Sequence, residues 1–177
     1  DSGDGNMINT VVKSSDYNDR YVTYDVLDDG FGQGALYTVV NQAENLPTMY
    51  QKFYVYKDMP YALVQVELGS DNEISTNFMA PISTSGENVV DIGTKTDARA
   101  LFVPFSNDGY TAYNPETLNG AHTSYFVTAI FDNNSRNSVI AGSVDHDTWK
   151  TGTSTWATAD NGNINFFGAF AGINSKE

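Results

Sequence analysis

The stretch "QKFYVYKDMPYALVQVEL", residues 51–68, decides the fold class. Its second half places an apolar side chain at every even position from Ala62 to Leu68, with polar Gln65 and Glu67 between them. Alternation with a period of two residues is typical of a β-strand that buries one face. The short connection "KDMP", which contains Pro60, interrupts the pattern. We therefore predict a hairpin of two strands, residues 51–57 and 61–68.

The same alternation recurs along the chain. In "YVTYDVL" it places Val22, Tyr24 and Val26 on one face. Two further hairpins are predicted, one from "TSYFVTAIF" and "SVIAGSV" (residues 123–144) and one from "TSTWATA" and "NINFFGAFAG" around "DNGN". A 3.6-residue apolar period does not persist beyond about ten residues anywhere in the sequence. About ten strands then indicate an all-β protein, an antiparallel, jelly-roll-like β-sandwich with little helix.

Length and composition predict the number of domains and the cellular location. A chain of 177 residues is expected to form a single domain over residues 1–177, with residues 1–6 as a linker or tail. The opening "DSGDGN" suggests a domain excised from a larger protein. The many Asn, Asp, Ser, Thr and Gly residues favour a secreted or cell-surface bacterial protein.

Charge and cysteine content exclude several classes of function. Nine basic against 22 acidic residues give a net charge of −13, which repels nucleic acid and anionic membranes. Cysteine is absent, so thiol catalysis, disulfides and thiolate metal sites are excluded. We expect no nucleic-acid partner, no membrane partner and a monomer within a multidomain chain.

The stretch "DHDTWKTG", residues 145–152, concentrates polar chemistry. If the preceding strand continues through it, Asp145, Asp147 and Trp149 share one face, with the carboxylates about 6–7 Å apart. That separation is near the one that glycoside hydrolases use, but their acids normally come from opposite walls of a cleft. A strand end followed by a turn at Thr151–Gly152, a binding role and catalysis all remain open. We interpret the stretch chiefly as a strand end. Asp145 and Asp147 border the binding site only if this end lies beside the 107–113 loop. Trp149 is a further candidate for that site, and the alternative is that its ring belongs to the core.

The loop "FSNDGYTAYN" offers a pattern suited to sugar recognition. Asn107 and Asp108 begin a turn that presents Tyr110 and Tyr113 beside polar groups. A pyranose stacks its C–H face on an aromatic ring while amides and carboxylates bind its hydroxyls. We predict a platform of Tyr110, Tyr113 and Trp156, with hydrogen bonds from Asn107 and Asp108. The alternative is that these rings cap the core.

Metal sites have weaker support. Four oxygen-rich loops could contribute to a structural calcium site, although none matches the full twelve-residue calcium-loop pattern. They are "DSGDGN", "DDG" at 28–30, "DNNSRN" at 132–137 and "DNGN" at 160–163. The two histidines, His122 and His146, lack zinc-type spacing. We expect no cofactor, with one structural calcium as the alternative.

Two runs within residues 101–152 carry a family resemblance. "LFVPFSNDGYTAYN" and "TSYFVTAIFDNNSRNSVIAGSVDHDTWKTG" resemble the β-rich, non-catalytic region of bacterial family 36 glycoside hydrolases, which are α-galactosidase-like proteins. That family keeps its catalytic carboxylates in a downstream barrel, so the resemblance implies a β-sandwich attached to carbohydrate-active machinery. The small size is also similar to that of carbohydrate-binding modules in secreted degraders of plant polysaccharides.

These observations lead to one expected function and two alternatives. We expect a non-catalytic carbohydrate-binding module that recognises a plant-type polysaccharide or oligosaccharide. The first alternative is a structural accessory β-domain that packs on a glycoside hydrolase barrel and has no ligand of its own. The second is a small glycosidase or lyase that uses Asp145 or Asp147 with another acid.

Overall fold

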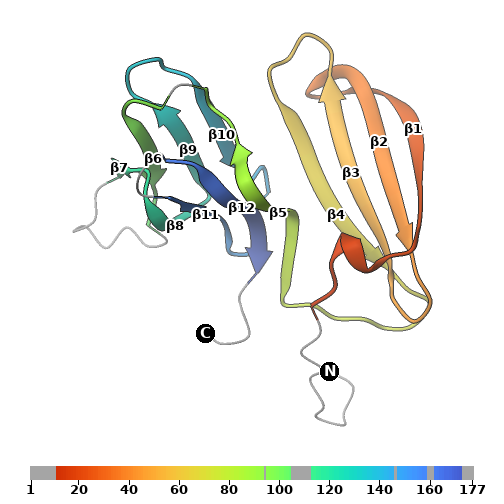
Figure 1. Cartoon of the computed structure of the whole chain (residues 1–177). Coiled ribbons are helices and arrows are strands. Elements are labelled where there is room, and N and C mark those ends of the chain that lie inside the picture. Colours follow the sequence, from red (N-terminus) through yellow and green to blue (C-terminus); the bar gives the residue numbers. More distant parts are fainter. Residues whose placement is uncertain (1–10, 94, 105–112, 146, 159–161, 173–177) are drawn as a thin grey trace. The chain divides into compact units, whose positions relative to one another are not determined.

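The protein is nearly all β, as the sequence predicts. The computed structural model describes residues 11–93, 95–104, 113–145, 147–158 and 162–172. Strands take up 63% of it and helix 2%, in three antiparallel sheets (Figure 1). The chain divides into two compact units, Asp1–Thr76 (unit 1) and Asn77–Glu177 (unit 2), where the sequence suggests one domain. Each unit is described by itself.

Unit 1 is a meander of four antiparallel strands. A short 3₁₀ helix, η1 (Ser14–Asp16), precedes them. The strands, in sheet order, are β1 (Asp19–Asp29), β2 (Gly32–Gln42), β3 (Thr48–Tyr56) and β4 (Ala62–Gly69). The predicted hairpin at residues 51–68 is confirmed, because β3 pairs with β4 antiparallel.

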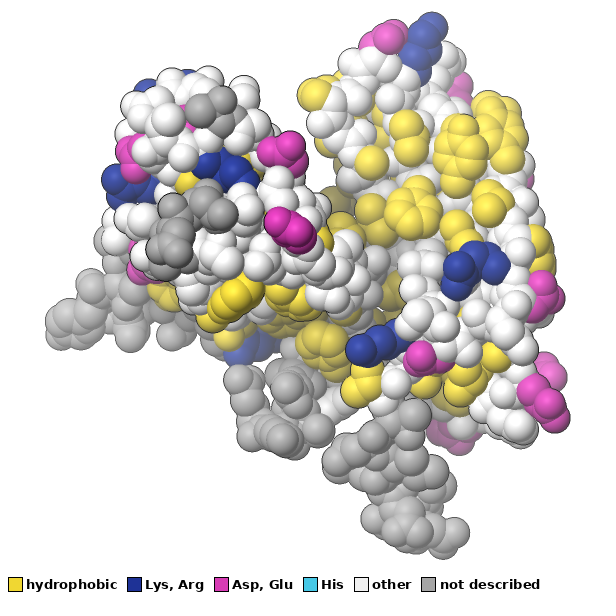
Figure 2. Space-filling view, viewed as in Figure 1, with side chains coloured by type: hydrophobic (Ala, Val, Ile, Leu, Met, Phe, Trp, Pro, Cys, Tyr) yellow, Lys and Arg dark blue, Asp and Glu magenta, His cyan; other side chains and the backbone are white. Residues whose placement is uncertain are grey.

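One side of this sheet is apolar from edge to edge. The register aligns Tyr24 with Tyr37 and Tyr37 with Phe53, so one row of rings crosses three strands. We call this side the apolar face. Its apolar residues are Val22, Tyr24, Val26, Ala35, Tyr37, Val39, Met49, Phe53, Val55, Ala62, Val64, Val66 and Leu68. Several of its side chains are exposed, Val26 to 78%. Figure 2 shows hydrophobic side chains gathered over the visible side of unit 1.

The opposite side of the sheet is more polar. Lys52 forms an ion pair with Glu67 at 2.7 Å, and Tyr54 donates a hydrogen bond to Gln65. Both pairs join β3 to β4. The two sides of unit 1 therefore differ in chemistry as the alternating sequence predicts.

Unit 2 is a sandwich of two four-stranded sheets (Figure 1). The first has the order β10-β9-β6-β7 and the second the order β5-β12-β11-β8. The strands are β5 (Phe78–Val90), β6 (Ala98–Phe102), β7 (Asn114–Thr117), β8 (Gly120–Tyr125), β9 (Val127–Asp132), β10 (Ser138–Gly142), β11 (Thr151–Ala157) and β12 (Ile164–Gly172).

Both sheets contribute to one closed core. Ala100 and Ile130 come from the first sheet, and Ala157, Ile164 and Phe167 from the second. Ile130 and Ile164 have no exposed surface. The predicted pairing of "TSTWATA" with "NINFFGAFAG" is confirmed, because β11 pairs with β12.

The predicted hairpin at residues 123–144 is only half correct. β9 pairs with β10, but "TSYFVTAIF" is not one strand, since it breaks at Phe126 into β8 and β9. Phe126 has a left-handed φ of 65°, its N–H donates to the Thr151 carbonyl, and its own carbonyl accepts from the Ser143 N–H. These bonds hold a turn that sends the chain from one sheet to the other.

Candidate functional site

The outer side of the sheet β5-β12-β11-β8 carries a row of aromatic rings. On β11, Thr151, Thr153, Thr155 and Ala157 are buried toward the core, so Trp156 points outward and is 46% exposed. Trp156 pairs directly with Phe166 of β12. Alternation along β12 then places Gly168 and Phe170 on the same side as Phe166. We call Phe78, Trp149, Trp156, Phe166 and Phe170 the aromatic platform.

Glycines let the rings of the platform lie close to the sheet. A Cβ atom at Gly168 would lie 3.1 Å from Cζ of Phe166, and one at Gly152 would lie 2.8 Å from Cζ of Phe170. The two phenylalanine rings therefore occupy the space that side chains at the glycines would fill. Phe78 of β5 stacks on Phe170, with centroids 5.7 Å apart and 21° between the ring planes.

Trp149 closes the other end of the row. A Cβ atom at Gly172 would lie 2.8 Å from Cζ3 of Trp149, so the indole lies against the last residue of β12. Gly172 pairs with Phe78, which continues the row. Trp149 is 39% exposed. Gly172 lies six positions after Phe166, which corresponds to about 20 Å along a strand.

Small hydroxyl side chains flank the rings. Ser83 and Ser85 of β5 align with Gly168 and Phe166, and both are exposed. On the other side of β12, Ser154 Oγ lies 3.3 Å from Thr123 Oγ1. The surface thus combines open ring faces with groups that both donate and accept hydrogen bonds.

Two residues of the predicted tyrosine platform belong to different sheets. Tyr113 is exposed and directly precedes β7, in the first sheet, whereas Trp156 lies in the second. Tyr110, Asn107 and Asp108 lie outside the described residues. Trp156 exposes its ring, and it lies in β11, the strand predicted from "TSTWATA".

"DHDTWKTG" does not continue the preceding strand, so the arrangement with Asp145, Asp147 and Trp149 on one strand face is not formed, and the predicted turn at Thr151–Gly152 is wrong. β10 ends at Gly142, and Thr151 and Gly152 begin β11 instead of forming a turn. Asp145 and Asp147 are exposed in the connection between the two sheets, and Oδ1 of Asp145 accepts the N–H of Asp147 at 3.3 Å. Their loop leads into Trp149, so both aspartates approach the platform only at that end.

The phenylalanines of the platform were not predicted as site residues. Phe78 lies almost ninety residues before Phe166 in the chain, and only the pairing of β5 with β12 brings them onto one sheet. The spacing of Phe166, Gly168 and Phe170 is a local signal that could have indicated an outward face. Glycine between two aromatic residues of the same strand face leaves room for their rings.

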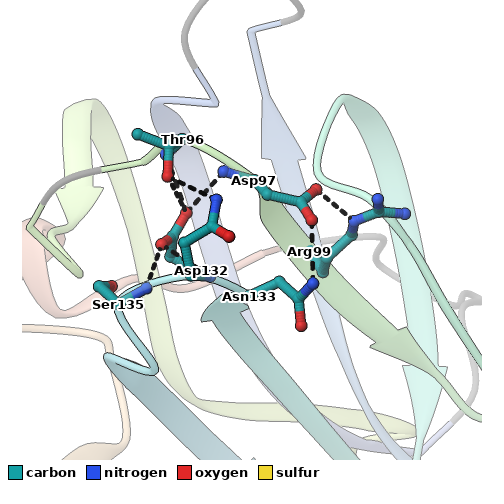
Figure 3. Close-up of polar contacts among 7 residues, drawn as sticks. Thr96, Asp97, Arg99, Asp132, Asn133 and Ser135 are labelled. Atoms are coloured by element: carbon teal, nitrogen blue, oxygen red, sulfur yellow. Dashed lines mark hydrogen bonds and ion pairs between the residues drawn. The ribbon is translucent and has the colours of Figure 1, made fainter.

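A second polar cluster surrounds Asp132 at the end of β9 (Figure 3). Oδ1 of Asp132 accepts the N–H groups of Thr96 and Asp97 at 2.8 and 2.7 Å, and Oδ2 accepts those of Asn134 and Ser135 at 3.2 and 2.7 Å. These bonds, that from Asp97 first, hold the pKa of the buried Asp132 carboxyl well below its usual range, although burial opposes them.

The geometry gives this cluster a structural role. Both oxygens of Asp132 are already occupied by N–H donors, which leaves the carboxylate neither open to a substrate nor free to bind calcium. Asp97 pairs with Arg99 at 2.6 Å and accepts from Asn133, and these bonds lower its pKa. The cluster joins the segment before β6 to the turn after β9 (Figure 3).

His122 and the acidic groups do not form a metal centre in the described residues. Nε2 of His122 lies 2.6 Å from the Asn119 carbonyl and Nδ1 lies 3.2 Å from Glu116. No group of three or more His, Cys, Asp or Glu side chains gathers in the part of the chain that the structure describes. His146 lies outside that part.

Comparisons of the chain with protein-family models, curated proteins and solved structures find no significant match. The resemblance of residues 101–152 to family 36 glycoside hydrolases therefore stays a prediction. Among the described residues, no helix is long and apolar enough to span a membrane.

Proposed function

We propose that this chain is a non-catalytic carbohydrate-binding module that holds a plant-type polysaccharide along the aromatic platform. The observation that carries the proposal is the row from Trp149 to Trp156 on the outer side of the second sheet of unit 2. A row of partly exposed rings along about 20 Å of strand suits an extended chain of several sugar rings better than a single small molecule.

Ring stacking supplies the main stabilisation in this proposal. Removing roughly 100 Å² of apolar area from water contributes about 2–3 kcal/mol. Two exposed indoles contribute roughly 4–6 kcal/mol, which together with a few hydrogen bonds, and less the cost of ordering the sugar, corresponds to a dissociation constant of about a millimolar or somewhat below. The hydroxyl groups of Ser83, Ser85 and Ser154 can both donate hydrogen bonds to sugar hydroxyls and accept them.

The arrangement of acids favours binding over hydrolysis. Glycoside hydrolases place two carboxylates on opposite sides of the scissile bond. Asp145 and Asp147 instead share one exposed loop at one end of the platform. We propose that they border the ligand near Trp149, and that the module works in a secreted or cell-surface protein alongside carbohydrate-active machinery.

Binding assays on plant polysaccharides test the proposal. In affinity electrophoresis and titration with soluble oligosaccharides, Trp156→Ala and Trp149→Ala should each weaken binding at least tenfold. Trp156→Tyr keeps a stacking ring and should lose less. Tyr113→Ala is the matched control, because this exposed ring adjoins the other sheet.

Each other result has a defined meaning. Loss of binding in Tyr113→Ala alone would move the site to the 105–113 segment. Absence of wild-type binding to any plant polysaccharide would favour the accessory-domain alternative. Turnover of a polysaccharide that Asp145→Ala or Asp147→Ala abolishes would show an enzyme.

A further inference from the structure

We propose that two copies of the chain associate through β1. The β1 strand of one copy pairs antiparallel with that of the other, centred on Tyr24, and this pairing joins two unit 1 sheets into one sheet of eight strands. This assembly goes beyond the proposed function and differs from the monomer expected from the sequence.

β1 is a long strand with a free edge. It is the first strand in its sheet, and no described strand pairs with its outer side. Ten of its eleven residues are exposed, and the other is half-buried. An unpaired strand of this length offers N–H and C=O groups ready to pair with another chain.

The backbone direction shows which residues supply those groups. Asp29 pairs with Gly32 across a two-residue turn, so the odd-numbered residues of β1 bond to β2. The bond from the Lys57 N–H to the Gln33 carbonyl agrees, because it directs the odd residues of β2 toward β3. Hence the even-numbered residues of β1 direct their N–H and C=O outward, and the same residues carry the side chains of the apolar face.

The symmetry of a dimer selects the register. The apolar faces of two copies form one surface only if even residues pair with even residues. Centring the pair on Tyr24 is the choice that uses the whole strand, Asp19–Asp29. Val22 then aligns with Val26 of the second copy, and Tyr24 with its own counterpart. These are pairs of residue types that stabilise antiparallel sheets.

Charge supports a second copy as the partner. In this register Arg20 aligns with Asp28 of the second copy, once at each end. Arg20 uses Nε and Nη2 for Asn41 and Ser14, which leaves its other N–H groups for a carboxylate. Asp28 accepts one long bond, 3.3 Å, from Gln33. β4, the other edge strand of the sheet, has no basic residue.

Repulsion between two acidic chains opposes this association. Each chain carries a net charge of −13, and Asp19 aligns with Asp29 at each end of the paired strands. Salt screens long-range repulsion more than it weakens a ladder of backbone hydrogen bonds. We therefore expect dimerisation to strengthen as the salt concentration rises from roughly 0.05 to 0.5 M.

Single cysteines test the register directly, because the chain has none of its own. Aligned residues of a hydrogen-bonded pair lie about 5.5 Å apart at Cα, which a disulfide spans. When Val22→Cys and Val26→Cys chains are mixed, the disulfide between the two variants should form at least fivefold more than a disulfide within either variant alone. Residue 22 of one copy lies roughly 13 Å along the strands from residue 22 of the other copy, which is too far for a disulfide. Val55→Cys, exposed on β3, is the control that should not cross-link.

Sedimentation with the full chain gives a second test. Asp28→Arg should weaken the dimer at least tenfold, since it places two arginines together, while Asp28→Asn should weaken it less. Glycan binding by these variants should be unchanged, so that failure of this proposal is distinct from failure of the proposed function. A wild-type monomer at roughly 0.1 mM and high salt, or equal cross-linking of all cysteine variants, would overturn the proposal.

Discussion

Units 1 and 2 use the same alternating strands but bury them differently. Unit 2 closes two sheets over Ile130 and Ile164, which have no exposed surface. Unit 1 is a single sheet in which Val22 and Val26 of the apolar face are exposed. A period-two pattern therefore predicts that a strand has an apolar side, but not that anything covers that side.

The largest expected effect is the loss of a core side chain in unit 2. Ile130→Ala should lower the free energy of unfolding by about 3 kcal/mol, because it removes buried methylenes and leaves a cavity. Ile140→Ala is a matched change on the adjacent strand β10, where the side chain is exposed, and should cost less than about 1 kcal/mol. Urea unfolding monitored by tryptophan fluorescence measures the free energy of unfolding of both variants, since Trp149 and Trp156 lie in unit 2.

Equal losses for the two isoleucine variants would contradict this comparison. They would show that the outer side of β10 is covered in solution as fully as the core. The sandwich would then have a further partner on its first sheet.

The strands of both units were largely predictable because their signal is local. Val22, Tyr24 and Val26 alternate within one strand, and the predicted common face is confirmed by the register. The break at Phe126 was not predictable in the same way, since no Gly, Pro or Asn marks it. Hydrogen bonds to residues 143 and 151, distant in sequence, hold that turn.

The candidate site was predictable only in part. Trp156 and Trp149 were both named as candidate site residues, and the structure places them at opposite ends of one platform. Phe78 could not be assigned to the same site from the sequence, because a local pattern does not show which strands pair across some ninety residues. Aromatic residues of strands usually pack in a core, but the second sheet of unit 2 also has an outer side, and these rings lie on it.

A second prediction concerns the buried carboxylate of unit 2. Asp132→Asn should lower the melting temperature on the order of 10 °C at neutral pH, because an amide donor replaces an acceptor that faces N–H groups. The lowered pKa of Asp132 means that its ionised form stabilises the fold above about pH 4, and that this contribution is lost as the pH falls below that value. Thermal melts between pH 7 and 3 should therefore show a shallower loss in the variant than in the wild type. The same acid-dependent loss in both proteins would assign the effect to other carboxylates, such as Asp97.

The stability of unit 1 is expected to fall at high pH, because of a buried tyrosine. Burial, and then the hydrogen bond from its hydroxyl to Asp29 at 3.0 Å, raise the pKa of Tyr56 to about 12. The neutral phenol thus stabilises the fold below about pH 10, and this contribution is lost as the pH rises from about 10 to 12. Tyr56→Phe should reduce the stability of unit 1 slightly at pH 7 and flatten its loss above pH 10. Hydrogen exchange of β1–β4 peptides, measured against those of unit 2, separates this effect from general alkaline unfolding.

The smallest expected effect is at the apolar face of unit 1. Val26→Thr should change the free energy of unfolding by less than about 0.5 kcal/mol, because the side chain is 78% exposed and threonine keeps the β-branched shape that strands favour. The substitution also keeps the backbone N–H, so it leaves the proposed β1 pairing intact. Hydrogen exchange in unit 1, measured at low protein concentration where copies are separate, gives the value for a single chain. The buried counterpart Val40→Thr, on the opposite side of β2, should cost more than about 1 kcal/mol and calibrates the measurement. If Val26→Thr lowered the free energy of unfolding as much as Val40→Thr, the apolar face would be covered within one chain. The two units would then differ in what covers the sheet rather than in whether the sheet is covered.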